Sequence, residues 1–575
     1  MRSTKKSALG VIATMLILMA TVLSACGGSG SPLPGTGNNT GGKAPADKQV
    51  FNWPLAGIAD IKTFDPAMAT TQTSLQAIGM VFTGLVTLDN DQKVVPELAD
   101  SWSASDGGKT WTFKLKPNLK FSDGTPVTSA DVAYSLNRAL LPDLGSPASP
   151  SYLNLIKDSD KMLAGKIKTI IGDSVLTPDP NTVVIKITQP AGYFLSTLTY
   201  STAYVVEKKL IDKYGNKNFT DHLTEGGGTG PFKVQEYTHG KRIVFVPNDN
   251  YVKAKPTIKV VSTFYKDATT TYEAYKNGQV DQAAVPTDFL NEVQSSKEYH
   301  KIPVLSIFYY GLNFMAKPFD NLNIRKAFAL ALNKDEMMKV VFKNVDVPTN
   351  HIVPSGMPGY NENLKGPDGT TSTAGNPTLA KQLFDKGLKE DGYANVAALP
   401  KIKFQYASGS ADTDKEIAVA VQQWKDVLGV TVQAVPTDFE TLSASLPKTV
   451  GNASVQMFES GWGADYPDPQ DFLTLQFAPG SPNNQTNWGQ NKTTDSAIQV
   501  QVQKALAAAD TEQDTTKRIQ AYNDAEQTLV NEVVWLPIFQ LARSRVLKSY
   551  VVGRTFNAGD STPPFEWAKV YIANH

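Results

Sequence analysis

The 575-residue chain is almost free of cysteine, since Cys26 is the only one. A single thiol excludes a disulfide within the chain, a metal site built from several cysteines and any other thiol nucleophile. The folded body must therefore be stabilised by its hydrophobic core, and the length of the chain suits about three domains.

Histidine is also scarce, and the motifs of common enzyme families are missing. No two of the five histidines have a metal-ligand spacing, and no GxSxG elbow is present. The GGKT sequence at Gly107–Thr110 lacks the leading glycine of a phosphate loop and precedes a predicted strand, so we interpret it as a hairpin turn. We interpret the glycines of Gly226–Phe232 as a tight connection. We therefore predict no cofactor, no metal and no enzymatic activity.

Neither sign of charge is in excess, because 55 basic residues balance 55 acidic ones. Removal of an N-terminal segment that holds Arg2, Lys5 and Lys6 leaves 52 basic residues against 55 acidic ones. Without a basic stripe, the sequence gives no reason to expect a nucleic-acid partner. Beyond this segment no second apolar run has membrane-spanning length, so we expect the remaining body to be water-soluble.

The N-terminus has the pattern of an export signal. Its three basic residues precede an apolar run, Ala8–Leu23, and the sequence Leu-Ser-Ala-Cys ends at Cys26. This resembles the lipobox of bacterial lipoproteins, in which the cysteine is lipidated and becomes the first residue of the mature chain. A transmembrane anchor is the alternative, but the run is shorter than the ~20 residues that a span needs. We predict a signal peptide over residues 1–25.

Residues 26–48 are predicted to form a flexible tether. They are rich in Gly, Ser, Pro and Asn, and such a composition cannot bury enough apolar surface to offset the entropy of ordering. The expected location is the cell envelope, with the protein held by lipid at the outer face of the cytoplasmic membrane or facing a periplasm.

Helices and strands alternate through the rest of the chain, which predicts a mixed α/β fold. Alternation of apolar and polar residues indicates half-buried strands, and an apolar stripe that ends at Gly429 indicates an amphipathic helix. Thr128 and Asp131 have the spacing of a capping box. The predicted strands are 110–116, 181–188 and 430–435, and the predicted helices begin near residues 129, 413 and 514.

Three aspartates are crowded into GWGADYPDPQDFL, Gly461–Leu473. Asp468 precedes a proline and suits the N-cap of a helix that continues through Phe472 and Leu475. Asp471 suits the third helical position, from which it could reach back to the amide of the cap residue. Interrupting prolines and the lack of a closing glutamate argue against a calcium loop.

Asp465 has no such structural task in the sequence. It follows an apolar segment that could end a strand, and it lies beside Trp462 and Tyr466 with no basic residue nearby. A carboxylate in a partly dry place needs a cation. That cation is either a distant lysine or arginine of the fold or the charge of a ligand.

Five segments, in order, resemble the peptide-type solute-binding proteins of ABC importers, solute-binding protein family 5, and most of all its oligopeptide- and dipeptide-binding lipoproteins. They extend over nearly the whole chain after the tether, and FSDGTPVTSADV is the most specific part. The segments are Phe64–Trp102, Trp111–Leu140, Gly228–Val234, Pro318–Met337 and Gly461–Leu473.

The resemblance implies an α/β clam of the periplasmic-binding-protein type, with two lobes and an additional domain. The hinge is expected to cross twice, near Pro303–Asn313 and after Leu541. The implied ranges are 49–82, 223–305 and 545–575 for the base domain of lobe one, 83–222 for the additional domain and 306–544 for lobe two.

The resemblance also implies a monomeric receptor that binds an extended peptide between the lobes and delivers it to a membrane permease with its ATPase. In relatives, the aspartate that matches Asp465 receives the α-ammonium of the peptide. The residues that match Gly461, Trp462 and Gly463 pair with its main chain. Thr71 and Gln72 are expected to give main-chain contacts from the other lobe.

Two other functions stay open at this stage. The same transport role could serve a non-peptide solute, such as an oligosaccharide stacked on Trp462, an opine-like amine or a metal chelate. An exported hydrolase would use Asp465 and a second carboxylate. We expect the pocket walls that set side-chain preference to lie in segments such as 141–166 and 356–398, which resemble the family least.

Overall fold

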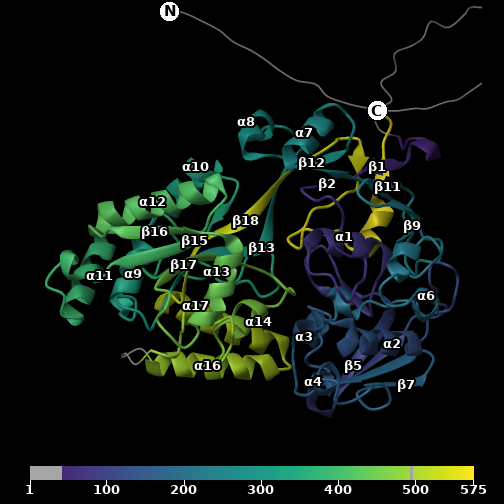
Figure 1. Cartoon of the computed structure of the whole chain (residues 1–575), viewed down its shortest axis with the longest axis horizontal. Helices are drawn as coiled ribbons and strands as arrows, with labels where there is room; N and C mark the ends of the chain where they lie inside the picture. The colour runs from purple at the N-terminus through teal and green to yellow at the C-terminus, as the bar shows by residue number, and fades with distance from the viewer. Residues whose placement is uncertain (1–41, 492–495) are drawn as a thin grey trace, which may run out of the picture.

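The structure is a computed structural model, which describes residues 42–491 and 496–575. Two lobes lie side by side and are joined by two long strands, β13 (Tyr299–Leu312) and β18 (Trp535–Leu547) (Figure 1). We call residues 42–298 and 548–575 the first lobe and residues 313–534 the second lobe. The predicted signal peptide, Cys26 and most of the predicted tether lie outside the described residues.

The first lobe contains two main sheets. One has the strand order β1-β11-β10-β9, with β2 paired to β11, and the other is a four-stranded antiparallel sheet of order β5-β6-β8-β7. The strands are β1 (Val50–Asn52), β2 (Leu55–Ala56), β5 (Ala99–Ser105), β6 (Thr110–Leu115), β7 (Val175–Asp179), β8 (Thr182–Lys186), β9 (Phe232–Thr238), β10 (Arg242–Pro247) and β11 (Lys259–Tyr265).

Smaller elements complete this lobe. Two short two-stranded sheets and several helices surround the main sheets (Figure 1). They are β3 (Val86–Leu88), β4 (Val94–Pro96), β19 (Val551–Val552), β20 (Tyr571–Ile572), α1 (Gln72–Val81), α2 (Ser129–Ala139), α3 (Ser149–Tyr152), α4 (Ser159–Leu163), α5 (Phe194–Thr197), α6 (Lys208–Tyr214), α7 (Ala268–Lys276) and α8 (Leu290–Val293).

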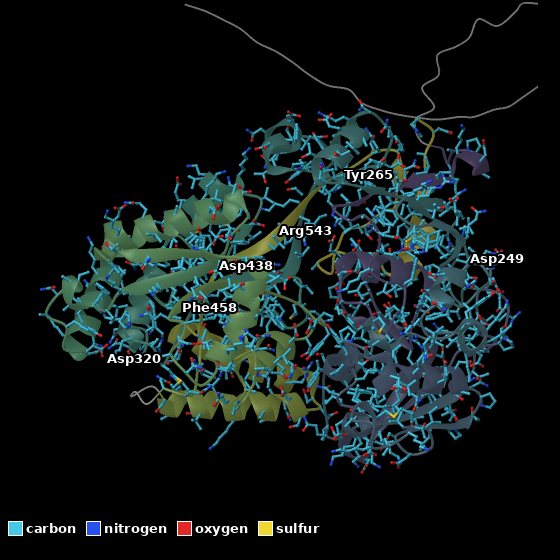
Figure 2. All side chains as sticks on the ribbon, in the orientation of Figure 1. Asp249, Tyr265, Asp320, Asp438, Phe458 and Arg543 are labelled. Carbon is cyan, nitrogen blue, oxygen red and sulfur yellow. The ribbon has the colours of Figure 1, made fainter. Side chains whose placement is uncertain are left out.

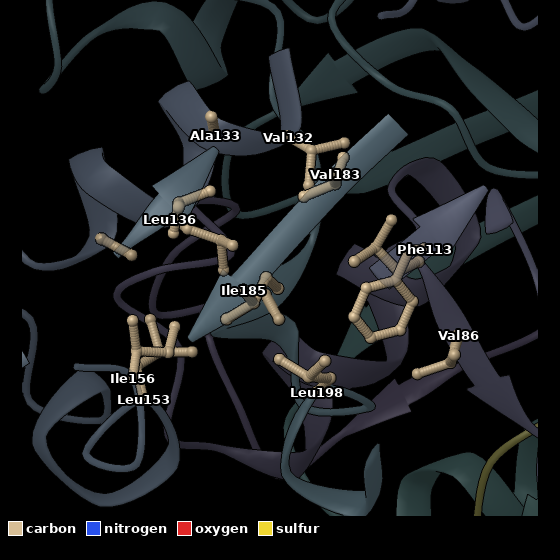
Figure 3. Close-up of a cluster of buried hydrophobic side chains, with 14 of the residues drawn as sticks. Val86, Phe113, Val132, Ala133, Leu136, Leu153, Ile156, Val183, Ile185 and Leu198 are labelled. Carbon is tan, nitrogen blue, oxygen red and sulfur yellow. The ribbon is translucent and has the colours of Figure 1, made fainter. Parts of the chain in front are cut away.

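The four-stranded sheet confirms the strand predictions. Phe113 of β6 and Val183 and Ile185 of β8 are fully buried and face α2 across one core (Figure 3). A tight turn at Asp106–Gly108 joins β5 to β6, so GGKT is part of a hairpin as predicted. The predicted capping box is present as well, because the Asp131 carboxylate accepts from both the amide and the hydroxyl of Thr128 at 2.8 Å.

The second lobe is built on a seven-stranded sheet of order β12-β18-β13-β17-β15-β16, with β14 paired to β18; its edge strand β12 comes from the range assigned to the first lobe. Both faces of this sheet are covered, because Tyr310 and Leu312 of β13 enter one apolar core while Ile307 and Tyr309 enter another. The strands besides β13 and β18 are β12 (Gln282–Ala284), β14 (Val347–Pro348), β15 (Ile402–Ala407), β16 (Val432–Thr437) and β17 (Met457–Gly463).

The helices of this lobe confirm the amphipathic predictions. Helix α12 buries Ile417, Ala420 and Trp424 and ends at Gly429, which has a left-handed φ of 70°. Strand β16 and helix α17 lie where predicted. The helices are α9 (Leu322–Leu330), α10 (Lys334–Phe342), α11 (Pro377–Glu390), α12 (Ala411–Leu428), α13 (Phe439–Ser445), α14 (Pro469–Phe472), α15 (Thr474–Phe477), α16 (Ser496–Thr511) and α17 (Thr515–Glu532).

The two connecting strands pair with each other, and their ladder is irregular where they pass between the lobes. Pro303 pairs with Ala542, and regular pairing resumes only at Ile307 and Gln540. An interrupted ladder bends more easily than a regular one. The irregular segment overlaps the hinge predicted near Pro303–Asn313. Among the helices described, none has the length and apolarity required to cross a bilayer.

The glycines of Gly226–Phe232 allow a close approach of β9 to the end of α1, as the predicted tight connection requires. A Cβ on Gly228 would lie 2.1 Å from the carbonyl oxygen of Val81. The amide of Gly230 donates to that same oxygen at 2.8 Å. A larger residue at Gly228 must therefore push two main-chain segments apart.

We predict that Gly228→Ala lowers the free energy of unfolding by about 2 kcal/mol or more, because the added methyl meets main chain that cannot yield cheaply. Gly79→Ala, inside α1, is the matched control. Its added methyl meets nothing within 4 Å, so it should stabilise the helix by about 0.5–1 kcal/mol. Urea unfolding of both variants measures this, and equal effects of the two substitutions would contradict the steric account.

Candidate ligand-binding site between the lobes

A cavity of about 350 Å³ lies between the lobes. The first lobe contributes residues of α1 and the segments 199–204 and 558–567, and the second lobe contributes Gly463–Pro467. The two connecting strands form the hinge side of the cavity through Val304–Ser306, Leu541 and Arg543. The cavity is therefore bounded by the first lobe, the second lobe and the two connecting strands.

Strand β17 brings the aspartate-rich stretch to this cavity. Gly463 pairs with Ser306 of β13, and the amide of Ala464 donates to the carbonyl of Leu305 at 2.7 Å. The strand ends there, so the apolar segment before Asp465 is a strand as predicted. Because the ladder fixes the chain up to Ala464, Asp465 is delivered to the cavity by a rigid element.

Asp471 holds the turn after β17, and its predicted role was wrong. Its fully buried Oδ2 accepts from Nε1 of Trp462 and from the amide of Asp465, both at 3.1 Å. It does not reach back to the cap residue, because the chain folds so that the amide of Asp465, ahead of the helix, is the closer donor. Burial, and then the nearby charge of Asp465, raise the pKa of Asp471 well above its usual range.

Asp468 is the N-cap of α14 as predicted, since its carboxylate accepts from the amide of Gln470 at 3.1 Å. The predicted continuous helix is instead two short ones, α14 and α15, with a break at Leu473. Asp468 has a second task that the sequence did not show. Arg518 of α17 donates to both of its oxygens, at 2.8 and 2.7 Å, and both side chains are buried.

Asp465 has no cationic partner among the described residues. Tyr152, from α3 of the first lobe, faces its carboxylate and acts to lower its pKa. Burial has the larger effect, so the pKa of Asp465 is raised above its ordinary value. The sequence left two possible partners for Asp465, a distant lysine or arginine of the fold or the charge of a ligand. The structure favours the ligand.

Tyr466, the residue after Asp465, belongs to the second lobe and contacts the first lobe. The ring of Tyr466 stacks on Tyr193 of the first lobe, with centroids 5.9 Å apart, and meets Tyr152 edge-on at 6.4 Å. Nearby, the amide of Gly192 in the first lobe donates to the carbonyl of Asp510 in α16 at 3.1 Å. The lobes thus touch along the rim that lies away from the connecting strands (Figure 1).

Three of the six predicted ligand-binding residues line the cavity, namely Asp465, Gly463 and Gln72. Trp462 does not, because its indole is held by Asp471 and packs against the core of the second lobe. Gly461, against the ring of Phe308, and Thr71, at the start of α1, also lie outside the lining.

Segments 141–166 and 356–398, which we expected to form pocket walls, contribute nothing to the lining of this cavity. Its aromatic and cationic walls come instead from residues that sequence reasoning missed. These are single positions far apart in the chain, with no local motif to mark them. They are Trp53, Tyr200, Tyr204, Arg543 and Trp567.

We predict that Asp468→Ala lowers the free energy of unfolding by about 3–5 kcal/mol, because it leaves the buried guanidinium of Arg518 without its partner. Arg242→Ala is the control. Arg242 pairs with Glu236 on the surface of β10, and loss of an exposed pair costs about 1 kcal/mol or less. Chemical denaturation of both variants tests this, and a loss below 1 kcal/mol for Asp468→Ala would refute it.

Comparison with known proteins agrees with this geometry. The family model of the bacterial extracellular solute-binding proteins, family 5, matches residues 93–484. The chain is 31% identical to the dipeptide-binding protein DppE of Bacillus subtilis over 83% of its own length and 84% of that protein. It is 29% identical to the oligopeptide-binding protein OppA of the same organism, over 92% and 93%.

A solved structure shows the same fold. The periplasmic murein tripeptide-binding protein MppA of Escherichia coli, in its unliganded open form, superposes with a TM-score of 0.77 at 23% identity, over 93% of this chain and 99% of that one. The two-lobed α/β clam implied by the sequence is thereby confirmed. The chain belongs to the bacterial extracellular solute-binding proteins, family 5.

Proposed function

We propose that the protein is the extracytoplasmic receptor of an ABC importer that binds peptides between its lobes and delivers them to a membrane permease and its ATPase. The relatives reported above are named for binding dipeptides, oligopeptides and a murein tripeptide. The observation that carries the proposal is Asp465, an acid without a cationic partner in the described chain, in a cavity between two lobes. This acid receives the α-ammonium of the peptide.

The main chain of the peptide pairs with β17 over Gly461–Gly463. On one side this stretch pairs with β13. On the other side, β15 pairs with β17 only at Met457 and Phe458, so among the described strands the last residues of β17 have an open edge. An open edge offers main-chain donors and acceptors to an added strand. Thr71 and Gln72, at the start of α1, supply main-chain contacts from the first lobe.

Closure brings the two lobes together about the connecting strands. We keep the domain ranges inferred from the sequence, namely 49–82, 223–305 and 545–575, then 83–222, then 306–544. The protein acts as a monomer held at the cell envelope by lipid on Cys26.

The other functions fit the site less well. The carboxylate nearest to Asp465, Asp471, is fully buried, is occupied by Trp462 and lies outside the cavity lining. It cannot serve as the second acid of a hydrolase. Trp462 lies outside the cavity lining with its indole held by Asp471, so it is not placed to stack a sugar there. A non-peptide amine satisfies Asp465 equally well, and the open edge of β17 favours a peptide over such a solute.

We predict that Asp465→Ala weakens binding of short alanine peptides at least about tenfold, because the ammonium loses a partly desolvated partner, an effect of about 2–5 kcal/mol. N-acetylation of the peptide should weaken binding to the wild type by a similar factor and have little further effect on the variant. Isothermal titration calorimetry gives both affinities.

Asp212→Ala, which removes an exposed acid on α6 that pairs with Lys208, is the matched control and should bind as the wild type does. If acetylated and free peptides bound the wild type equally, Asp465 would not be the ammonium site.

We also predict that peptide affinity falls as the solution is acidified from about pH 8 to about pH 4. The carboxylate must be ionised to bind an ammonium, and burial raises the pKa of Asp465 above its ordinary value. Affinity is therefore complete above that raised pKa and is lost as the pH falls through it. Titration calorimetry across this range measures the loss. An Asp465→Asn variant should show a flatter profile, and a wild-type profile as flat as that of the variant would count against the assignment.

A further inference from the structure

The two lobes also meet at a contact that lies away from the connecting strands. Figure 2 shows Arg543, on the connecting strand β18, in the upper part of the boundary between the lobes, whereas α16 reaches the first lobe at the lower end of that boundary (Figure 1). The second lobe contributes Tyr466 and the connection between α16 and α17, and the first lobe contributes the segments 191–193 and 106–108. We call this contact the clasp. Points far from a hinge move furthest when it bends, so the clasp is well placed to resist parting of the lobes.

The ring of Tyr466 is the apolar part of the clasp. Although Tyr466 belongs to the second lobe, it is only 7% exposed and packs within the apolar core of the first lobe, against Tyr193 and Tyr152. Its hydroxyl donates to the side-chain oxygen of Gln470 in its own lobe. Parting the lobes would return this ring to water, which opposes the movement.

A glycine brings the main chain of the first lobe onto a buried arginine of the second. The amide of Gly192 donates to the carbonyl of Asp510 at 3.1 Å. A Cβ at Gly192 would lie 2.7 Å from Cδ of Arg518 and 3.0 Å from the carbonyl oxygen of Glu512. Arg518 cannot move aside without breaking its two hydrogen bonds to Asp468. This close approach of the lobes therefore requires glycine at position 192.

A second glycine rests on the same connection. Gly108, in the turn between β5 and β6, has a φ of 88°, and a Cβ there would lie 2.8 Å from Oε1 of Gln513. Gln513 is exposed and can move, so this contact is the looser of the two. All of these partners are groups of the chain itself, so the clasp needs no ligand in order to form.

We propose that the clasp holds the lobes together independently of the ligand and limits the rate at which a bound solute leaves. Gly192, Arg518 and the connection between α16 and α17 lie outside the lining of the cavity. The clasp therefore slows the release of different solutes by a similar factor and leaves the choice among them to the cavity. The kinetic part rests on the proposed function, because a peptide reports it, whereas the contact between the lobes does not.

The first test is a graded pair of variants, Gly192→Ala and Gly192→Val. Each added side chain meets Arg518 and the main chain of Glu512, so the lobes should separate further as the side chain grows. Small-angle X-ray scattering of the protein without added peptide should show a radius of gyration that rises from the wild type to Gly192→Ala and again to Gly192→Val. An unchanged radius in both variants would refute the clasp.

The second test follows the release of trialanine by stopped flow. Gly192→Val should release the peptide about tenfold or more faster than the wild type, because a change at an interface acts mostly on dissociation. The ratio of the affinities for trialanine and N-acetyl-trialanine should stay that of the wild type. A ratio that changed as much as the release rate would show that the glycine acts on the ligand site itself, and the clasp would be wrong.

Thr188→Ala is the matched control, since Thr188 is exposed in the same segment, four residues before Gly192. It should leave the scattering and the release rate unchanged, while thermal unfolding checks that the Gly192 variants fold.

Hydrogen exchange tests the clasp without any variant, because the bond from the Gly192 amide to Asp510 crosses between the lobes. This amide should be protected in the wild type, and exchange at the rate of a free amide would contradict the clasp. If trialanine did not bind the wild type, the proposed function would fall, while scattering and hydrogen exchange would still decide the clasp.

Discussion

The buried carboxylate of Asp471 is the constraint on which the site depends. A carboxylate cut off from water is costly without donors; here Oδ2 accepts from the Trp462 indole and the Asp465 amide, while Oδ1 has no hydrogen-bond partner among the described residues. Trp462 lies in β17 and Asp465 lies two residues beyond its end, so one acid fixes a strand terminus, an aromatic ring and the turn that follows. The tryptophan, glycines and aspartates of the motif thus form one unit that presents a single charge to the cavity.

Ion pairs are distributed unevenly between the body of the protein and the cavity. Inside the lobes, two buried acids have full cationic partners, through the two hydrogen bonds from Arg138 to Asp65 in the first lobe and from Arg518 to Asp468 in the second. In the cavity, Asp465 has no cationic partner among the described residues. The pairs in the lobes stabilise the fold, while this carboxylate remains available to a solute, which is the arrangement that a receptor needs.

Local pattern predicted much of the fold but less of the site. Strand alternation at Phe113 and Val183, the Thr128–Asp131 cap and the stop at Gly429 are short-range features, and each was predicted correctly. Asp465 was found because the helix rules accounted for its neighbours. The role of Asp471 was missed because its donors are set by a turn rather than by helical spacing. Arg543 was missed because its environment is created by strand pairing and by Asp560, and neither is visible from its neighbours in the sequence.

The position of Tyr466 beside Asp465 has one more consequence. Tyr466 stacks on Tyr193 of the first lobe, while the amide of its neighbour Asp465 is held by Asp471 of the second lobe. Because these are consecutive residues of one turn, the ring that joins the lobes and the acid that faces the cavity move as one unit with the second lobe.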